Sequence, residues 1–225
     1  MYEGFYDENH RMLKISMQDL TIFSKPRTGE YDRYILCREC DNVRIGELES
    51  YAKPIIYGGS EGLSESQIPR GENRVSQGGM ELTYFENLDY KKFKLFLLSV
   101  LWRASVSKRE TFGLIHLGSD EEVLRKMIYS GDPMKANDYP CMMFTYLNDD
   151  SLPVDIIGQP HPGKKGAARF YNFLISGMFY IYFTSIGDED IFDPTMPINE
   201  KGEIRIIHLP KGEGKLFYDA FSGKH

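Results

Sequence analysis

A series of short apolar segments, separated by Gly, Pro and Asp, makes up most of the chain after residue 139. The segments are PCMMFTYL, PVDIIG, ARFYNFLIS, MFYIYFTS, EIRIIHL and KLFYDAF. Their β-branched and aromatic residues favour strands, and the turn residues between them are typical of short connections. ISGMF, where two of these segments meet, predicts a tight hairpin. The sequence therefore predicts a mostly antiparallel β-sheet from about residue 140 onward.

Two helices are predicted before this sheet. In residues 89–105 the apolar side chains recur at helical spacing, and Asp89 is placed to cap the first turn. Residues 120–130 follow Ser119, and Glu122 stands three positions after that serine, which is the spacing of a capping box. We expect the two helices to pack together as one unit.

The N-terminal part of the chain predicts shorter elements. Residues 12–24 contain two apolar runs, which favour a hairpin or two strands, and RYILC at 33–37 predicts a short strand. NVRIGELESYA, residues 42–52, places its apolar residues at roughly helical spacing, and Pro54 is expected to end that helix. From residue 57 to residue 79 the chain is rich in Gly, Ser and charge, which predicts a mobile loop.

These elements together predict an α+β fold with an internal boundary. We expect an N-terminal unit of residues 1–58, a flexible loop of residues 59–79 and an α+β unit of residues 80–225. A chain of 225 residues is long enough to bury a large core without the help of disulfides or metals.

Cys37 and Cys40 form the most chemically specific motif of the chain. Two residues separate them, and they lie between the predicted strand and the predicted helix in YDRYILCRECDNVRIGELESYA. A strand that delivers Cys-x2-Cys to the first turn of a helix is how the second ligand pair of a treble-clef zinc finger is built. The same pattern also describes a dithiol redox pair, and ordinary buried cysteines are a third interpretation. We favour the metal interpretation over the redox one because no parallel βαβ pattern follows the motif.

The stretch ILCRECDN, with the helix predicted after it, resembles the second half of an HNH-type endonuclease domain, which is a zinc-bound treble clef. The wider stretch GEYDRYILCRECDNVRIGELESYA is similar to a group of uncharacterised bacterial proteins. The resemblance implies a treble-clef-like strand–turn–helix remnant in which Cys37 and Cys40 bind Zn²⁺. The family's first Cys-x2-Cys pair is not present in this sequence, and Asp41 stands where its metal-binding histidine is expected.

These departures bear on catalysis. If the chain cleaves nucleic acid, Asp41 together with Glu47 or Glu49 has to hold Mg²⁺, which stabilises the leaving oxygen and activates water. The resemblance thus implies an HNH-related, nucleic-acid-associated protein whose catalytic site is degenerate. The alternative hypothesis is a non-enzymatic protein-interaction module in which the metal site has decayed.

Basic residues in loop segments are the candidates for nucleic-acid contact. Arg38 lies between the two cysteines, and Lys164, Lys165 and Arg169 belong to a segment, GQPHPGKK and the residues after it, that predicts a basic turn. The other loop cations are Lys25, Arg27, Arg33, Arg70 and Arg74. If several of these side chains converge, they can follow a phosphate backbone, with Tyr and Phe as stacking platforms. The simpler alternative is ordinary solvated surface charge.

Charge and composition limit the remaining classes. The chain has 27 Lys and Arg against 33 Asp and Glu, so DNA or RNA has to be bound by a local basic patch. The opening MYEGFYDENHRM does not look like a signal peptide, and NFLISGMFYIYFTSI is too short for a membrane helix. We therefore expect a cytoplasmic protein whose partner is DNA, RNA or another protein, and no association with a membrane.

Overall fold

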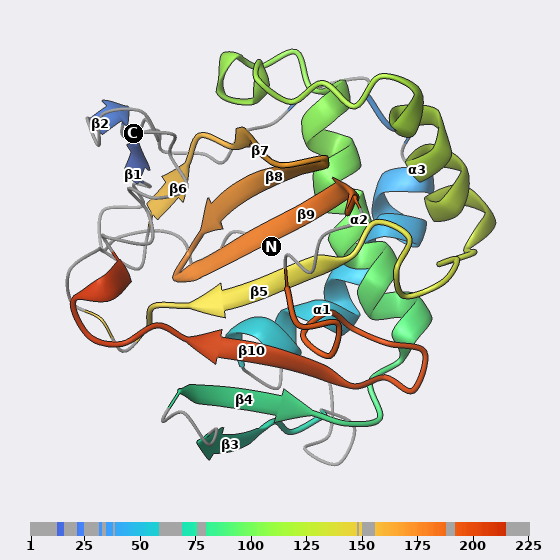
Figure 1. The fold of residues 1–225 in the computed structure, drawn as a ribbon. Helices are drawn as coiled ribbons and strands as arrows, with labels where there is room; N and C mark the ends of the chain where they lie inside the picture. The colour runs from blue at the N-terminus through green and yellow to red at the C-terminus, as the bar shows by residue number, and fades with distance from the viewer. Residues whose placement is uncertain are drawn as a thin grey trace.

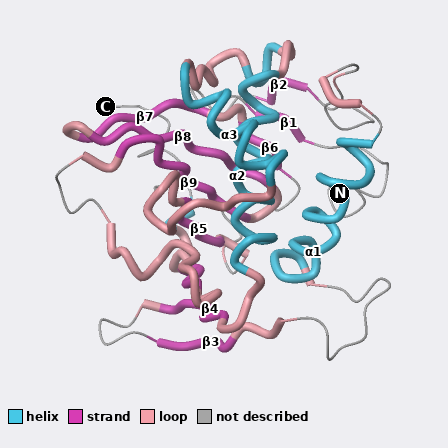
Figure 2. Tube along the Cα trace, turned by 90° about the vertical axis from the view of Figure 1, so that its right-hand side faces the viewer, coloured by secondary structure: helices cyan, strands magenta, loops and turns pink. Residues whose placement is uncertain are grey.

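The computed structural model describes residues 13–15, 22–24, 32, 35–37, 39–58, 69–75, 80–147, 149, 156–187 and 192–214. These residues form a large β-sheet with a layer of helices against one of its faces, as Figure 1 and, from the side, Figure 2 show. The predicted α+β class is confirmed. None of the helices in the described part of the chain has the length and apolar character that a bilayer crossing requires.

The elements follow one another in an order that alternates between sheet and helices. They are β1 (Leu13–Ile15), β2 (Ile22–Ser24), a π-helical turn (Cys40–Ile45), α1 (Gly46–Tyr57), β3 (Glu72–Val75), β4 (Glu81–Phe85), α2 (Tyr90–Val106), a 3-10 turn (Glu110–Phe112), α3 (Ser119–Ser130), β5 (Cys141–Thr145), β6 (Ile156–Gly158), β7 (His161–Lys165), β8 (Ala168–Ile175), β9 (Met178–Ser185) and β10 (Ile204–His208).

The described strands form one ten-stranded sheet in the order β2-β1-β6-β8-β9-β5-β10-β4-β3, with β7 also paired to β8. Two pairs, β1–β6 and β5–β10, are parallel, and the other pairings between these strands are antiparallel. β8 and β9 are joined by Ser176 and Gly177, whose φ angles are 44° and 80°. A two-residue turn with positive φ at both positions matches the twist of the flanking strands, so the predicted hairpin is confirmed.

The burial of β9 shows why apolar residues follow one another without alternation in the strand segments after residue 139. Alternate residues of the strand enter two different apolar layers, one against the helices and one on the opposite face of the sheet. The helix-side residues are Met178, Tyr180 and Tyr182, and the opposite ones are Phe179, Ile181 and Phe183. A strand that is buried on both faces needs apolar side chains at consecutive positions.

The strand predicted at 33–37 is not formed at its described residues, because Ile35 and Leu36 lie in a bend. The chain instead enters the π-helical turn Cys40–Ile45, which continues into α1 without a break. The helix of the proposed strand–turn–helix remnant is therefore present, whereas its strand is not formed at these positions. The treble-clef-like arrangement stays a prediction.

Pro54 lies inside α1 and does not end the helix, contrary to the prediction. The helix continues to Tyr57 and stops at Gly58, whose φ of 70° is easily adopted by glycine. Ile55 and Ile56, directly after the proline, are both buried. Their burial offsets the backbone hydrogen bond that proline cannot donate.

Described residues of the predicted N-terminal unit share a core with the predicted α+β unit, and the division at residues 1–58, 59–79 and 80–225 stays a prediction. Ile45 and Ala52 belong to the same apolar core as α2, α3 and the helix-side face of the sheet. The loop predicted for residues 59–79 also contains a strand, β3, which pairs with β4. β3 is an edge strand with all four residues exposed, so no apolar alternation marks it in the sequence.

The two predicted helix starts differ in outcome. Asp89 caps α2 as predicted, since its Oδ1 accepts a hydrogen bond of 2.9 Å from the backbone N–H three residues later. α3 begins at Ser119 without the predicted capping box. The Glu122 carboxylate accepts hydrogen bonds of 2.6 and 2.9 Å from Arg125 instead of reaching back to the start of the helix.

Lys94 of α2 is buried in spite of its charge, with 2% of its surface exposed. Its Nζ donates hydrogen bonds to the Tyr90 hydroxyl, over 3.1 Å, and to the carbonyl oxygen of Lys135. Burial lowers the pKa of Lys94 to about 8. The carboxylates that oppose this shift belong to Asp138, Glu200 and Asp132.

We expect the folding stability of the wild-type protein to rise between pH 8 and pH 10 relative to a Lys94→Met variant. The folded pKa of Lys94 lies below the ordinary value of 10.5, so in this window the unfolded chain binds more protons than the folded chain. Stability then increases with pH until the unfolded amine also deprotonates. Urea unfolding at several pH values measures the two slopes, with Lys92→Met, an exposed position on the same helix, as the control. Equal slopes for the wild type and Lys94→Met would contradict the expectation.

Candidate functional site

The thiols of Cys37 and Cys40 face each other at the start of the first helical segment. Their sulfur atoms lie 3.0 Å apart, and the backbone N–H of Cys40 donates a hydrogen bond of 3.3 Å to the Cys37 sulfur. Cys37 is exposed and Cys40 is half-buried. Hydrogen bonds from Cys40 lower the pKa of the Cys37 thiol from its usual value. The structure thus brings the predicted pair together, and it contradicts the interpretation of two ordinary buried cysteines.

Side chains at the end of α3 surround Cys40. The Tyr129 hydroxyl is hydrogen-bonded to the Cys40 side chain, and this contact, with burial, raises the pKa of Tyr129 to about 12. The guanidinium groups of Arg44 and Arg125 lie 5.9 and 5.4 Å from the centre of the Tyr129 ring. Arg44 also donates a hydrogen bond to the carbonyl oxygen of Tyr129. The thiol pair is therefore held between the first helical turn and α3.

A structural zinc site needs four ligands in a tetrahedron. Within the described ranges, no group of three His, Cys, Asp or Glu side chains could hold a metal ion. Cys141, the third cysteine, is buried in β5. Two thiolates on one tetrahedral zinc stand about 3.8 Å apart, given a Zn–S distance of about 2.3 Å, which is wider than the separation of Cys37 and Cys40. The described residues do not fit a complete zinc site, and zinc stays a prediction that needs ligands from outside them.

The predicted Mg²⁺ ligands are not gathered into a site. Glu49 Oε1 lies 2.7 Å from Arg103 Nη1 on α2, and the two side chains are 23% and 27% exposed. Asp41 and Glu47 are exposed on the first turns. Glu49 therefore ties α1 to α2, and it supplies the opposite charge that a half-buried arginine requires.

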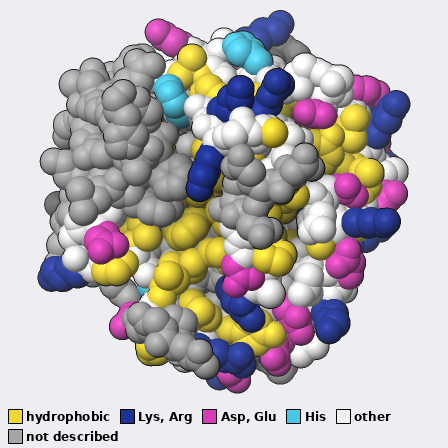
Figure 3. All heavy atoms as spheres, viewed as in Figure 1, with side chains coloured by type: hydrophobic (Ala, Val, Ile, Leu, Met, Phe, Trp, Pro, Cys, Tyr) yellow, Lys and Arg dark blue, Asp and Glu magenta, His cyan; other side chains and the backbone are white. Residues whose placement is uncertain are grey.

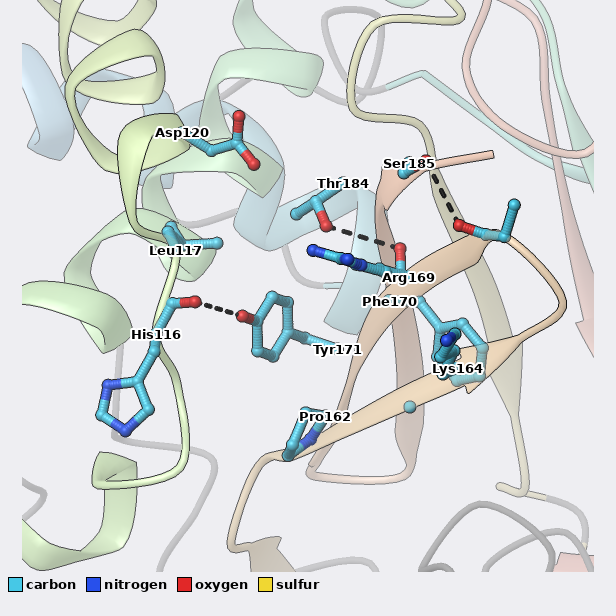
Figure 4. A pocket seen from close by; sticks show the side chains of 12 residues that line it. His116, Leu117, Asp120, Pro162, Lys164, Arg169, Phe170, Tyr171, Thr184 and Ser185 are labelled. Atoms are coloured by element: carbon cyan, nitrogen blue, oxygen red, sulfur yellow. Dashed lines mark hydrogen bonds between the residues drawn. The ribbon is translucent and has the colours of Figure 1, made fainter. Parts of the chain in front are cut away.

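A second cluster lies where the β7–β8 hairpin meets the start of α3. The segment predicted as a basic turn is the strand β7, which pairs with β8 so that Lys164 stands opposite Arg169. β7 has β8 as its partner and Pro162 lies within it, as is common in edge strands. A hollow of about 510 Å³ opens between the hairpin, the end of β9 and the chain leading into α3 (Figure 4).

Guanidinium and hydroxyl groups line this hollow. Arg169 points into it beside Thr184, and Tyr171 reaches across it toward the chain before α3 (Figure 4). The Tyr171 hydroxyl donates a hydrogen bond of 2.5 Å to the carbonyl oxygen of His116. Burial raises the pKa of Tyr171, so this hydroxyl stays protonated and the contact persists at neutral pH. The contact joins β8 to the segment that leads into α3.

The lining of the hollow carries more positive than negative charge. Lys164 and Arg169 are exposed, and Asp120 is the carboxylate among the lining residues. Its Oδ1 accepts a hydrogen bond of 2.9 Å from the Tyr139 hydroxyl. Figure 3 shows Lys and Arg side chains gathered near the top of the view, over β7 and β8. The register of β8 against β9 shifts between Arg169 and Phe170. Such bulges change the direction of the side chains next to them and are common beside binding sites.

The structure brings together part of the predicted set of cations. Lys164 and Arg169 line one hollow, whereas Lys165 is exposed at the next position of β7 and is not among the lining residues. Arg74 forms an ion pair of 2.8 Å with Glu72 in β3. Arg38, with Lys25, Arg27 and Arg33, lies outside the described residues.

Sequence reasoning missed several lining residues. His116, Asp120 and Thr184 were not among the candidate site residues. His116 and Asp120 come from the segment that leads into α3, far from the β7–β8 hairpin in the sequence, whereas Thr184 lies in β9, directly after β8. The approach of His116 and Asp120 to the hairpin depends on how α3 lies relative to the sheet, for which the chain carries no local signal.

No family model, characterised protein or solved structure matches this chain. The resemblance to HNH-type endonucleases therefore still depends on ILCRECDN and the stretch around it, and it stays a prediction.

Proposed function

We propose that this protein binds single-stranded nucleic acid by its phosphate backbone, at the hollow between the β7–β8 hairpin and α3. The observation that carries the proposal is the cross-strand pairing of Lys164 with Arg169, which presents two exposed cations at one hollow. Arginine and lysine are the main ligands of nucleic-acid phosphates.

The acidic balance of the chain does not oppose this mode of binding. The formal net charge is −6, but charges more than about 8 Å from a bound phosphate are largely screened at physiological salt. Among the residues that line the hollow, two cations, Lys164 and Arg169, stand against one carboxylate, Asp120. The rings of Phe170 and Tyr171 also border the hollow and offer surfaces on which a sugar or a base can pack. A concave site of this kind favours a flexible single strand over a stiff duplex.

The proposal does not include strand cleavage. Glu49 is engaged by Arg103, and Asp41 and Glu47 point to solvent at the start of the helix. We therefore infer an HNH-related protein with degenerate catalysis, as the resemblance implies.

Incubation of plasmid DNA and of single-stranded DNA with the protein and Mg²⁺ or Mn²⁺ should leave both intact. Metal-dependent nicking that disappears in Glu49→Gln would overturn this part of the proposal.

Fluorescence anisotropy with labelled single-stranded DNA and RNA tests the binding site. We expect the wild type to bind at low salt and a Lys164→Ala, Arg169→Ala double variant to bind at least about tenfold more weakly, since hydrogen bonds to charged groups contribute about 1.5 to 3 kcal/mol each. Both side chains are exposed, so the double variant should keep the stability of the wild type.

Lys201→Ala provides the matched control, because it also removes one exposed lysine. Lys201 precedes β10, and β9 and β5 lie between β10 and the hairpin strands in the sheet. Its affinity should equal that of the wild type. If the folded wild type binds neither DNA nor RNA, the nucleic-acid proposal fails, and the alternative hypothesis of a protein-interaction module is favoured. If Lys201→Ala weakens binding as much as the double variant, the hairpin is not the site.

A further inference from the structure

Cys37 and Cys40 have the arrangement of an attacking thiol and a resolving thiol. Cys37 is exposed, so a solute can reach its sulfur, whereas Cys40 is half-buried against α3. The two sulfurs are 3.0 Å apart, and a disulfide bond of about 2.05 Å requires them to approach by about 1 Å.

The surroundings of Cys40 suit a thiol better than a metal ligand. The Tyr129 hydroxyl is hydrogen-bonded to the Cys40 side chain. In the described part of the chain, no third metal-binding side chain joins the pair. The environment therefore provides two reactive sulfurs and a hydroxyl hydrogen-bonded to one of them.

We propose that Cys37 and Cys40 form a thiol–disulfide exchange site whose co-reactant is a small organic disulfide such as glutathione disulfide. This site lies at the start of the π-helical turn, beside α3, and does not depend on the proposed binding of nucleic acid at the hairpin.

The exchange proceeds in two displacements. The Cys37 thiolate attacks one sulfur of the organic disulfide, whose S–S bond breaks; the other half leaves as a thiolate and takes up the proton that Cys37 lost. The Cys40 thiolate then attacks the Cys37 sulfur of the mixed disulfide and expels the second half, which takes up the proton of Cys40. The protein gains the Cys37–Cys40 disulfide and loses two electrons, and the organic disulfide is reduced to two thiols.

Equilibration of the full chain in buffers of defined reduced and oxidised glutathione tests the proposal. After acid quenching, unreacted thiols are labelled with a maleimide reagent under denaturing conditions and counted by mass spectrometry. We expect Cys37 and Cys40 to be lost together in one transition, with Cys141, buried in β5, still labelled. Independent loss of single thiols, or no loss in the most oxidising buffer, would refute the site.

Two single substitutions separate the roles of the thiols. Cys40→Ser should accumulate a mixed disulfide between Cys37 and glutathione, because no resolving thiol is present. Cys37→Ser should form much less adduct at the shielded Cys40 under the same conditions. The reverse pattern, with the adduct mainly in Cys37→Ser, would overturn the assigned direction of attack. Stoichiometric zinc in the protein as purified, released only when both thiols are modified, would overturn the exchange site in favour of a metal site.

Tyr129 acts as a positioning residue, and its effect is measurable in the same buffers. Its hydrogen bond to Cys40 stabilises the reduced form, so Tyr129→Phe should shift the thiol–disulfide equilibrium toward the disulfide by about fivefold, the effect of one hydrogen bond. Tyr84→Phe, which removes a hydroxyl in β4, serves as the control. An unchanged equilibrium in Tyr129→Phe would show that the tyrosine does not influence the pair.

Discussion

Replacement of Gly202 by alanine should destabilise the protein by about 2 to 5 kcal/mol, which combines backbone strain with steric overlap. Gly202 is buried in the turn before β10 and has a φ of 77°. A Cβ atom here would lie 2.1 Å from the carbonyl oxygen of Leu88 and 2.7 Å from its nitrogen. The backbone N–H of Leu88 also donates a hydrogen bond of 3.0 Å to the Gly202 carbonyl. The overlap is with backbone, so no side-chain rotation can relieve it.

Gly212→Ala separates the two contributions. Gly212 has a similar φ of 88°, but a Cβ atom there would meet no atom within 4 Å. This variant should therefore show the conformational cost alone, about 1 to 2 kcal/mol. Urea unfolding of both variants measures the difference. Equal losses would mean that the contact between Gly202 and Leu88 is not tight in solution.

Phe93→Ala should lower the free energy of unfolding by about 3 to 5 kcal/mol, because it removes a large ring from a closely packed core. Phe93 lies in α2 within the core that the helices and the sheet share, and none of its surface is exposed. Its ring centre is 6.4 Å from that of Phe96, so part of the loss comes from an aromatic contact.

The matched control is Lys91→Ala, an exposed position two residues earlier in the same helix. It should change stability by no more than about 0.5 kcal/mol, which shows that helix propensity alone does not cause the loss. If Phe93→Ala also changed stability by no more than about 0.5 kcal/mol, the close packing around Phe93 would be contradicted.

The elements that bury apolar side chains were predictable from the sequence. α2 and α3 begin within a residue of the expected positions, and the β8–β9 hairpin forms at Ser176–Gly177. In each case the local pattern and the tertiary burial agree. β3 and β7 were missed because they are exposed, polar strands held by backbone pairing to one neighbour, and such pairing leaves no apolar alternation.

Tertiary contacts overrode local rules at two other positions. Pro54 should end a helix, but burial of the isoleucines that follow it carries α1 onward. Glu122 has capping-box spacing, yet an arginine one turn later binds its carboxylate. The two candidate sites also differ in whether local sequence or tertiary contacts form them. The Cys37–Cys40 pair is local and was found from spacing, whereas the hollow at the hairpin joins distant segments and could be found only in part.

The salt dependence of oligonucleotide affinity tests the central claim, that Lys164 and Arg169 contact phosphates, most directly. Each phosphate contact to a single strand releases counterions and contributes about 0.7 to the slope of log K against log salt concentration. The double variant Lys164→Ala, Arg169→Ala should therefore give a slope about 1.4 shallower than the wild type, and Lys201→Ala should leave the slope unchanged. A double variant with the wild-type slope would show that these two cations do not contact the phosphate backbone.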